Sequence, residues 1–186
     1  MIDFQKSLET EKVMLRPICQ EDFDEMKELT KDEKVWDYFT SNLAVKEQLF
    51  RWIQTAVEAM NNQERMAFSI IDKEHKKIIG STSLGNFSER DQRIEIGWTW
   101  LAASARGTGM NQHVKKLLLR YCFEELKLER VESKTDVLNL AARKGLQKSG
   151  LTEEGVLRSH TLLANGRRRD SIFYGILKNE WFESQL

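Results

Sequence analysis

The chain has 186 residues, of which 40% are hydrophobic and 31% charged, and its 29 basic side chains balance 29 acidic ones. This length suits a single domain, expected here over residues 1–186, which can bury a full core without disulfides or a metal. The zero formal charge argues against a dedicated nucleic-acid or membrane-surface protein, because such proteins usually carry a clear basic excess.

The sequence carries no signal for metal binding or export. The two cysteines, Cys19 and Cys122, are far apart and form no C-x-x-C pair, and none of the three histidines has metal-ligand spacing, so we expect no metal site. Residues 1–10 lack an apolar core of signal-peptide length, and no apolar run approaches the roughly 20 residues of a membrane span. We therefore expect a cytoplasmic protein with no membrane partner.

The first part of the chain is predicted to form a strand, two helices and three strands. In chain order these elements are Val13–Ile18, Glu21–Lys31, Val45–Asn61, Met66–Asp72, Lys77–Phe87 and Arg93–Leu101. The last strand alternates, so one face should carry Ile94, Ile96, Trp98 and Trp100, and the other Glu95, Gly97, Thr99 and Leu101. Three successive strands favour antiparallel pairing.

Helix and strand then alternate before a closing hairpin. The pattern predicts a helix over Gly109–Leu126, a strand over Arg130–Val137, a helix capped by Asn139 and ended by Gly150, and strands over Gly155–Ala164 and Asp170–Lys178 joined by an Asn165-Gly166 turn. The strand–helix–strand order favours one parallel crossover. We expect a three-layer α/β fold, with a mixed, mostly antiparallel sheet, one parallel strand pair, and helices on both faces.

The most informative segment is the loop Arg106-Gly107-Thr108-Gly109-Met110-Asn111, which opens the strongest predicted helix. Its two glycines allow positive φ and the close approach of another group to the backbone. The free N–H groups and the dipole of the helix favour an anion there, and Arg106 adds a positive charge. The Walker pattern and the full dinucleotide fingerprint are both missing. The loop is therefore either a cradle for a diphosphate or an ordinary tight turn with a glycine N-cap.

The order of short motifs resembles the GNAT N-acetyltransferase superfamily, and within it the branch that acetylates ribosomal-protein N-termini. The family loop is Arg/Gln-x-x-Gly-x-Gly/Ala, matched by Arg106 and Gly109, with Asn111 in place of the final small residue. Similar motifs follow one another through nearly the whole chain, at Leu8–Glu11, Leu15–Pro17, Ile78–Ser81, Glu95–Trp98, Asn139–Ala142, Gly150–Leu151, Glu154–Arg158, Gly166–Asp170 and Glu180–Trp181. The resemblance implies a GNAT-like sheet.

The resemblance also implies acetyl-coenzyme A (acetyl-CoA) as cosubstrate and a primary amine, on a protein N-terminus or a small molecule, as acceptor. The diphosphate would be held by backbone N–H groups after Arg106, those of Gly107, Thr108, Gly109, Met110 and Asn111. The pantetheine arm would pair with the backbone of Trp98, Thr99 and Trp100, where two strands splay, and one N–H there would polarise the thioester carbonyl. Asn139 and Ala142 would lie along this arm. Homodimers are common in the family, so a homodimer is a further expectation.

The chemistry requires a neutral amine, and protein amines are largely protonated near neutral pH, so a general base is expected. Glu95 is the candidate, because members of the resembling family can place a carboxylate on this strand. The competing interpretation is a solvent-facing carboxylate on a half-buried strand. Glu132 and Asp136, on the charged face of the neighbouring strand, are weaker candidates.

The departing thiolate needs a proton or another stabiliser, and the usual donors are missing. Many GNAT enzymes have a tyrosine seven residues after the asparagine, where this chain has Leu146. The Rim-like branch can have a serine three residues after it, where this chain has Ala142. Water or a residue elsewhere could act instead. The alternative is a catalytically weak GNAT-fold module that binds CoA or serves regulation.

Two further groups of residues each allow two interpretations. Arg167–Arg169, with Arg158, could bind an acidic substrate or RNA, although a solvated hairpin tip is the simpler expectation. Four aromatic residues in the helical region before the second predicted strand could hold the acceptor or pack in the core: Trp36, Tyr38, Phe39 and Trp52.

Overall fold

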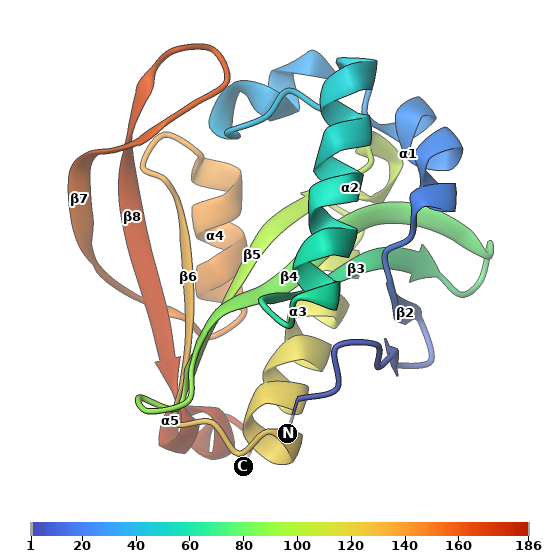
Figure 1. Cartoon of the computed structure of the whole chain (residues 1–186). Helices are drawn as coiled ribbons and strands as arrows, with labels where there is room; N and C mark the ends of the chain where they lie inside the picture. The colour runs from blue at the N-terminus through green and yellow to red at the C-terminus, as the bar shows by residue number, and fades with distance from the viewer. Residues whose placement is uncertain (1, 186) are drawn as a thin grey trace.

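Eight strands form one sheet in this computed structural model, which describes residues 2–185 (Figure 1). The strands are β1 (Leu8–Glu9), β2 (Val13–Pro17), β3 (Arg65–Asp72), β4 (Lys77–Ser88), β5 (Arg93–Leu101), β6 (Arg130–Asp136), β7 (Thr152–Leu162) and β8 (Arg168–Leu177). They lie in the order β1-β2-β3-β4-β5-β6-β8-β7. Every neighbouring pair is antiparallel except β5 and β6, which are parallel. The predicted mixed sheet with one parallel pair is confirmed.

Helices cover both faces of this sheet (Figure 1). α1 (Phe23–Leu29) and α2 (Lys46–Asn61) lie on one face, α3 (Met110–Arg120) and α4 (Leu140–Lys148) lie on the other, and a short α5 (Lys178–Glu183) follows β8. Several elements were not predicted because they are too short to show a periodic apolar pattern. These are β1, α5 and the 3-10 segments Glu33–Tyr38 and Ala103–Ala105. The 3-10 segment Gln20–Asp22 forms the start of the predicted helix Glu21–Lys31.

Each face of the sheet has its own buried core. On one face α3 contributes fully buried residues such as Val114 and Leu118. On the other face, α2 and the 3-10 segment Glu33–Tyr38 contribute Ile53 and Trp36. The apolar stripe predicted for the long central helix is confirmed, although its last part is a π-helical turn. Packing from both sides fixes the central strands that carry the site.

A bulge interrupts β5. Ser81 of β4 pairs with Trp100 and Ser83 pairs with Gly97, so two residues of β5 face one residue of β4. Trp98, one of those two, has a left-handed φ of 52°, a conformation that a tryptophan rarely adopts. Bulges of this kind redirect side chains and recur beside active sites.

The bulge also overturns one prediction from the sequence. Ile96 lies in the core beneath α3, whereas Trp100 lies in the core beneath α2. The extra residue reverses the alternation of side chains along the strand. The prediction of a single face carrying Ile94, Ile96, Trp98 and Trp100 is therefore wrong beyond the bulge.

β5 and β6 separate after three residue pairs. Their parallel pairing joins Arg93–Glu95 to Arg130–Glu132 and then ends. The Ser133 hydroxyl donates to the carbonyl of Ile96 at 2.8 Å just beyond that point. From there β6 keeps only β8 as its partner, so a gap opens between β5 and β6 at the stretch of β5 that holds the bulge.

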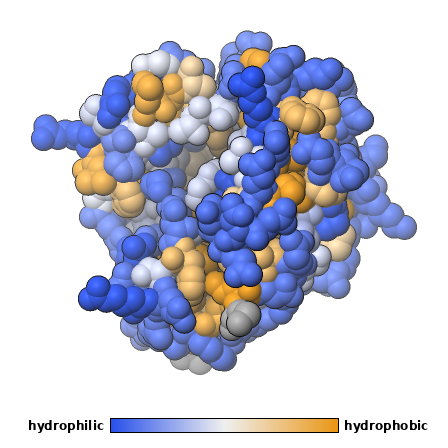
Figure 2. Space-filling model, viewed as in Figure 1, coloured by the Kyte–Doolittle hydropathy of each residue, from blue (hydrophilic) through white to orange (hydrophobic). Residues whose placement is uncertain are grey.

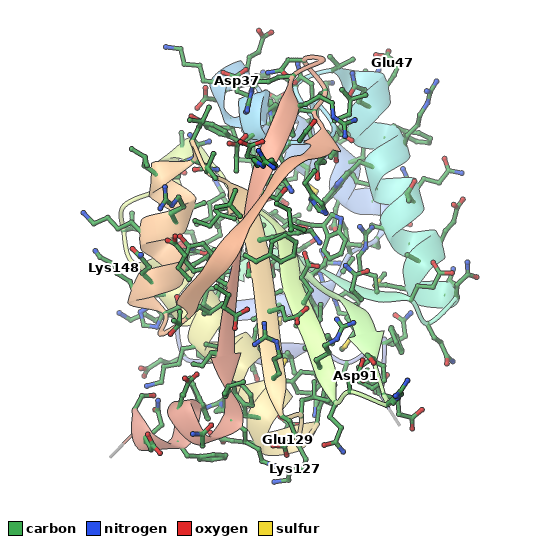
Figure 3. All side chains as sticks on the ribbon, turned by 90° about the vertical axis from the view of Figure 1, so that its left-hand side faces the viewer. Asp37, Glu47, Asp91, Lys127, Glu129 and Lys148 are labelled. Atoms are coloured by element: carbon green, nitrogen blue, oxygen red, sulfur yellow. The ribbon has the colours of Figure 1, made fainter. Side chains whose placement is uncertain are left out.

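The β7–β8 hairpin closes over one end of this gap. The predicted Asn165-Gly166 turn is present, with Gly166 at a φ of 82°. The tip reaches the 3-10 segment Glu33–Tyr38, since the Ala164 N–H donates to the carbonyl of Phe39 at 3.0 Å. Figure 3 shows the tip beside the labelled Asp37. Two segments far apart in sequence thus wall one end of the gap.

The face of the molecule on the α2 side is mostly hydrophilic (Figure 2). Its apolar areas are small and separate, and the surface is hollowed between the β7–β8 side and α2. Within residues 2–185, every helix is too short or too polar to cross a membrane.

Candidate active site

Five successive backbone N–H groups at the start of α3, those of Gly107 to Asn111, have no hydrogen-bond partner among residues 2–185. Gly107 and Gly109 have left-handed φ values of 76° and 90°, and Gly109 is the N-cap of α3. Free amides at a helix N-terminus, together with the helix dipole, favour an anion. The loop therefore supplies the donors that the predicted diphosphate site requires.

The side chain of Arg106 is engaged by its neighbours. Its Nε donates to the carbonyl of Leu101 at 2.9 Å, and its Nη1 forms an ion pair with Asp32 at 2.8 Å. The hydrogen bond from Arg106 lowers the pKa of the Asp32 carboxyl below its usual value. From the sequence, Arg106 was expected to add a positive charge to the loop. The structure places a carboxylate beside it, so the two side chains together add little net charge to the loop.

A groove runs from this loop to the gap between β5 and β6. It consists of two adjoining cavities, and the inner one, at the gap, has a volume of about 270 Å³. Most of the predicted binding residues line the groove, namely Trp98, Thr99, Trp100, Arg106, Gly107, Asn111, Asn139 and Ala142. Thr108, Gly109 and Met110 do not line it. The Thr108 hydroxyl donates to the Ala105 carbonyl at 2.7 Å, and Met110 packs against the core.

Two asparagines lie where the cavities meet. Asn139 is the N-cap of α4, and its Oδ1 accepts from the Ala142 N–H at 3.1 Å, which confirms the predicted cap. The Oδ1 of Asn111 is buried and has no hydrogen-bond partner among the described residues. A buried unpaired oxygen is destabilising. A ligand with a donor group in the groove would satisfy this one.

Glu95 is buried, with 7% of its surface exposed, and lines the inner cavity. Its Oε2 accepts from Lys134 Nζ at 2.6 Å and from Asn86 Nδ2 at 2.9 Å. Its Oε1 has no hydrogen-bond partner within residues 2–185. The expectation of a solvent-facing carboxylate is therefore wrong. One oxygen is held in place and the other is open, which lets the carboxylate accept a proton from a group in the cavity.

The two weaker candidates for a base lie outside the groove. Glu132 accepts from Arg93 at 3.2 Å and from Arg130 at 2.8 Å. Asp136 is fully buried and forms an ion pair with Arg167. Both carboxylates are occupied by arginines, and neither lines the inner or the outer cavity.

Several groove residues were missed by the sequence analysis. The inner cavity is also lined by Lys115, Lys134 and Thr161, which come from three different elements. Lys115 left a detectable signal, because it lies one helical turn after Asn111 and interrupts an apolar stripe. The other two have no local pattern and reach the cavity only through the tertiary fold.

The three hairpin arginines lie in three different environments. Arg167 pairs with buried Asp136, and Arg168 Nε donates to the hydroxyl of Ser159 at 2.9 Å on the surface. Arg169 lines the inner cavity, where burial lowers the pKa of its guanidinium. The expectation of one solvated basic tip is therefore wrong for Arg167 and Arg169.

The aromatic residues of the helical region divide into two groups. Trp36 is buried, donates from Nε1 to the carbonyl of Thr30 at 2.9 Å, and packs edge-on against Trp100. Trp52 packs against the same core. Of the four residues named from the sequence, only Tyr38 and Phe39 line the groove.

Other reactive groups lie away from the groove. Asp72, Glu74 and His75 have ligand atoms within 4.8 Å of one another after β3, and the Asp72 carboxylate raises the pKa of His75. Cys122 is fully buried in the α3 core, where burial raises the pKa of its thiol. It is therefore an unreactive core residue.

Comparison with known proteins identifies relatives of this chain. Residues 12–152 match the model of an acetyltransferase (GNAT) domain. YdaF of Bacillus subtilis, provisionally named a ribosomal N-acetyltransferase, is 36% identical over 104 residues, which is 56% of this chain and 56% of YdaF. The uncharacterised N-acetyltransferase p20 of Bacillus licheniformis is 29% identical over 181 residues, 95% of this chain and 98% of p20.

A solved structure shows the same fold. The GCN5-related N-acetyltransferase from Brucella melitensis superposes with a TM-score of 0.86 at 23% identity, covering 95% of this chain and 80% of that one. The family generally uses acetyl-CoA as its cosubstrate. With the domain match covering most of its length, this chain belongs to the GNAT acetyltransferase family and is an acyltransferase.

Proposed function

We propose that the protein transfers the acetyl group of acetyl-CoA to a primary amine, and that residues 1–186 form one N-acetyltransferase domain. One observation carries the proposal: a continuous groove joins the loop that bears the five free amides of residues 107–111, of which Gly107 and Asn111 line the groove, to a cavity that holds the open oxygen of Glu95. The groove thus combines an anion site, which suits the diphosphate of an elongated thioester, with a proton acceptor, which suits an amine.

The residues present fit the cosubstrate. The amides of residues 107–111 suit a diphosphate, and the unpaired Oδ1 of Asn111 suits a donor on the pantetheine arm. Asn139 and Ala142 wall the same stretch. Acetyl-CoA, when bound, supplies the activated acyl group, and the protein holds it with its thioester toward the gap.

The inner cavity would support direct attack by the amine. Glu95 accepts the proton of the acceptor ammonium at its open Oε1, directly or through a water. A backbone N–H of the bulged stretch Trp98–Trp100 donates to the thioester oxygen as negative charge develops there. Both substrates occupy the groove together, so the acetyl group passes to the amine in one complex.

The acceptor in this proposal is a protein N-terminus. A cavity of about 270 Å³ lies near the lower limit for small-molecule pockets, which suits the end of a chain whose remainder lies outside. The name of YdaF, a provisional ribosomal N-acetyltransferase, points to the same class and to a cytoplasmic location. A small amine is the other acceptor that the panel below tests.

A second candidate function, a CoA-binding or regulatory module, rests on the missing hydroxyl groups of the inner cavity. Ala142 and Leu146, which stand where related enzymes place a hydroxyl, both line the inner cavity and carry none. A CoA-binding or regulatory module without efficient turnover would show this arrangement.

Calorimetry with CoA and release of its thiol against a panel of peptides and small amines separate the two candidates. The proposal expects binding, with turnover on at least one acceptor class. Tight binding without turnover on any acceptor favours the module, and absence of binding contradicts both.

A further inference from the structure

Lys115 is a buried lysine that faces the reaction end of the groove. It lies on α3 between core residues, only 4% of its surface is exposed, and its side chain lines the inner cavity. Its Nζ makes one long hydrogen bond, 3.4 Å to the hydroxyl of Thr99, and no carboxylate of residues 2–185 lies within 4.0 Å of it. Lys115 therefore has neither the solvent nor the ion pair that normally stabilises an ammonium group.

This burial is unfavourable for the charged lysine. Burial lowers the pKa of Lys115 to about 8, and the charge of Glu95 acts in the opposite direction. An apolar side chain of similar length would fill the same space without this penalty. A strongly shifted group that faces a cleft is a candidate functional residue.

The other side chains of the inner cavity are poorer proton donors for a leaving group. Lys134 is paired with Glu95 at 2.6 Å, and the guanidinium of Arg169 does not release its proton near neutral pH. Thr99 is already hydrogen-bonded to Thr82 at 2.8 Å. Tyr38 is half-exposed where the two cavities meet.

Lys115 also lies in the right part of the groove. It shares the inner cavity with Ala142 and Leu146, the two positions that lack the usual hydroxyl, and it contacts Thr99 in the bulge. The thioester would approach the same bulge under the proposed function. An ammonium group here can protonate the departing thiolate, which the side chains of Ala142 and Leu146 cannot do.

We propose that Lys115 is the acid that protonates the departing sulfur of CoA; this rests on the proposed function. The amine nitrogen forms a bond to the thioester carbonyl carbon, and the carbon–sulfur bond breaks with its electron pair on sulfur. The Lys115 ammonium gives one proton to that sulfur, which leaves CoA as a thiol and the lysine neutral. The acceptor nitrogen loses two protons between the ammonium and the amide, one before it attacks and one after. Glu95 takes each in turn and passes it to solvent. One of these equivalents restores the Lys115 ammonium, and the other is the proton that each turnover releases.

The ionisation of bound CoA tests this proposal without an acceptor. Thiolate absorbance is followed against pH for CoA bound to the wild-type protein, to Lys115→Met, and to Lys116→Met, a control that changes an exposed lysine on the same helix. A nearby positive charge favours the thiolate. The thiol pKa should therefore be about one unit lower in the wild type and Lys116→Met than in Lys115→Met.

Each other outcome has a defined meaning. Equal thiol pKa values in the wild type and Lys115→Met, with CoA bound to both, overturn the role of Lys115 and leave the proposed function standing. A rise in Tyr38→Phe but not in Lys115→Met assigns the role to the tyrosine instead. Failure of the wild type to bind CoA overturns the proposed function itself.

Turnover gives a second test, because rescue by an added amine and a change in the pH profile are not expected of a residue with a merely structural role. Lys115→Ala should lose about 100-fold or more in kcat and regain part of it with an added tertiary amine, which can give a proton but keeps no acetyl group. The wild-type rate should fall as pH rises through about 8, because the lysine loses its proton, and this decline should vanish in Lys115→Ala. Acetylation of Lys115 itself during turnover would show a nucleophile and overturn the assignment.

Discussion

The two ends of the groove are built from different parts of the chain. The loop end uses backbone N–H groups from one continuous segment, residues 107–111. The reaction end uses side chains from separate elements, among them Glu95 on β5, Lys115 on α3 and Lys134 on β6. Backbone N–H donors remain when most side chains of the loop are changed. A site made of side chains can instead lose a donor at one position and gain a donor at another. If Lys115 is the acid, this difference explains why Ala142 and Leu146 stand at the positions where the resembling enzymes carry a hydroxyl.

The largest expected effect is at the reaction end. Glu95→Gln removes the proton acceptor and should lower kcat about 100-fold or more, shift the pH profile, and leave CoA affinity unchanged. Steady-state kinetics and calorimetry measure both quantities. Glu132→Gln is the matched control, because that carboxylate lies on the adjacent strand outside the cavity. Wild-type kinetics in Glu95→Gln would remove this residue from the mechanism.

The free energy of unfolding tests whether the buried ammonium of Lys115 destabilises the folded protein. Its pKa is about 8 in the folded protein, against an ordinary lysine value of 10.5, so below pH 8 the folded state bears the full penalty of a buried charge. Lys115→Met should therefore be more stable than the wild type by about 3 kcal/mol at pH 7. The difference should shrink as pH rises from 8 to 10.5, because the wild-type lysine becomes neutral in both states.

Urea unfolding at several pH values measures this difference. Lys116→Met, which changes an exposed lysine, should show no comparable gain. Equal stability of Lys115→Met and the wild type at pH 7 would show that the ammonium is well solvated, and the contrast between the two ends of the groove would weaken.

The loop end is tested by a change of backbone rather than charge. Gly109→Ala forces a left-handed φ of 90° on a residue with a Cβ, which should lower stability by about 1–2 kcal/mol and CoA affinity by about 10-fold. Gly166→Ala meets a similar φ of 82° in open space at the hairpin tip. It should lose similar stability while keeping CoA affinity. If both variants bind CoA as the wild type does, the loop is only a turn.

The smallest expected effect comes from the ion pair beside the loop. Asp32→Asn frees Arg106 from its carboxylate, so CoA should bind about twofold more tightly at low salt, with the gain lost at high salt. Asp37→Asn, an exposed change on the 3-10 segment that Asp32 precedes, is the control. Weaker binding in Asp32→Asn, measured by calorimetry, would show that the pair holds the loop in place.

Local sequence patterns predicted most of the fold. The period of the apolar residues located the long strands and helices, and Asn139 and Asn165-Gly166 marked a cap and a turn that the structure contains. Short elements such as β1 and α5 lack a readable period. The bulge at Trp98 depends on pairing with β4, which no pattern within β5 reveals.

The candidate site likewise has one part that local sequence could predict and another that depends on the tertiary fold. The free amides of residues 107–111 follow from glycines and a helix start within one segment, so the sequence could indicate them. The partners of Glu95, which are Lys134 and Asn86, lie on neighbouring strands and are known only once the sheet forms. Asp32, which neutralises Arg106, is equally remote in sequence.

Titration of the isotope-labelled protein with CoA, followed by amide NMR, tests most directly whether the amides opening α3 bind the diphosphate of CoA. Under the proposed function, CoA produces its largest amide shifts at Gly107 to Asn111, the five groups without partners among residues 2–185, with smaller shifts at the bulge of β5. CoA binding that leaves those five resonances in place would contradict it.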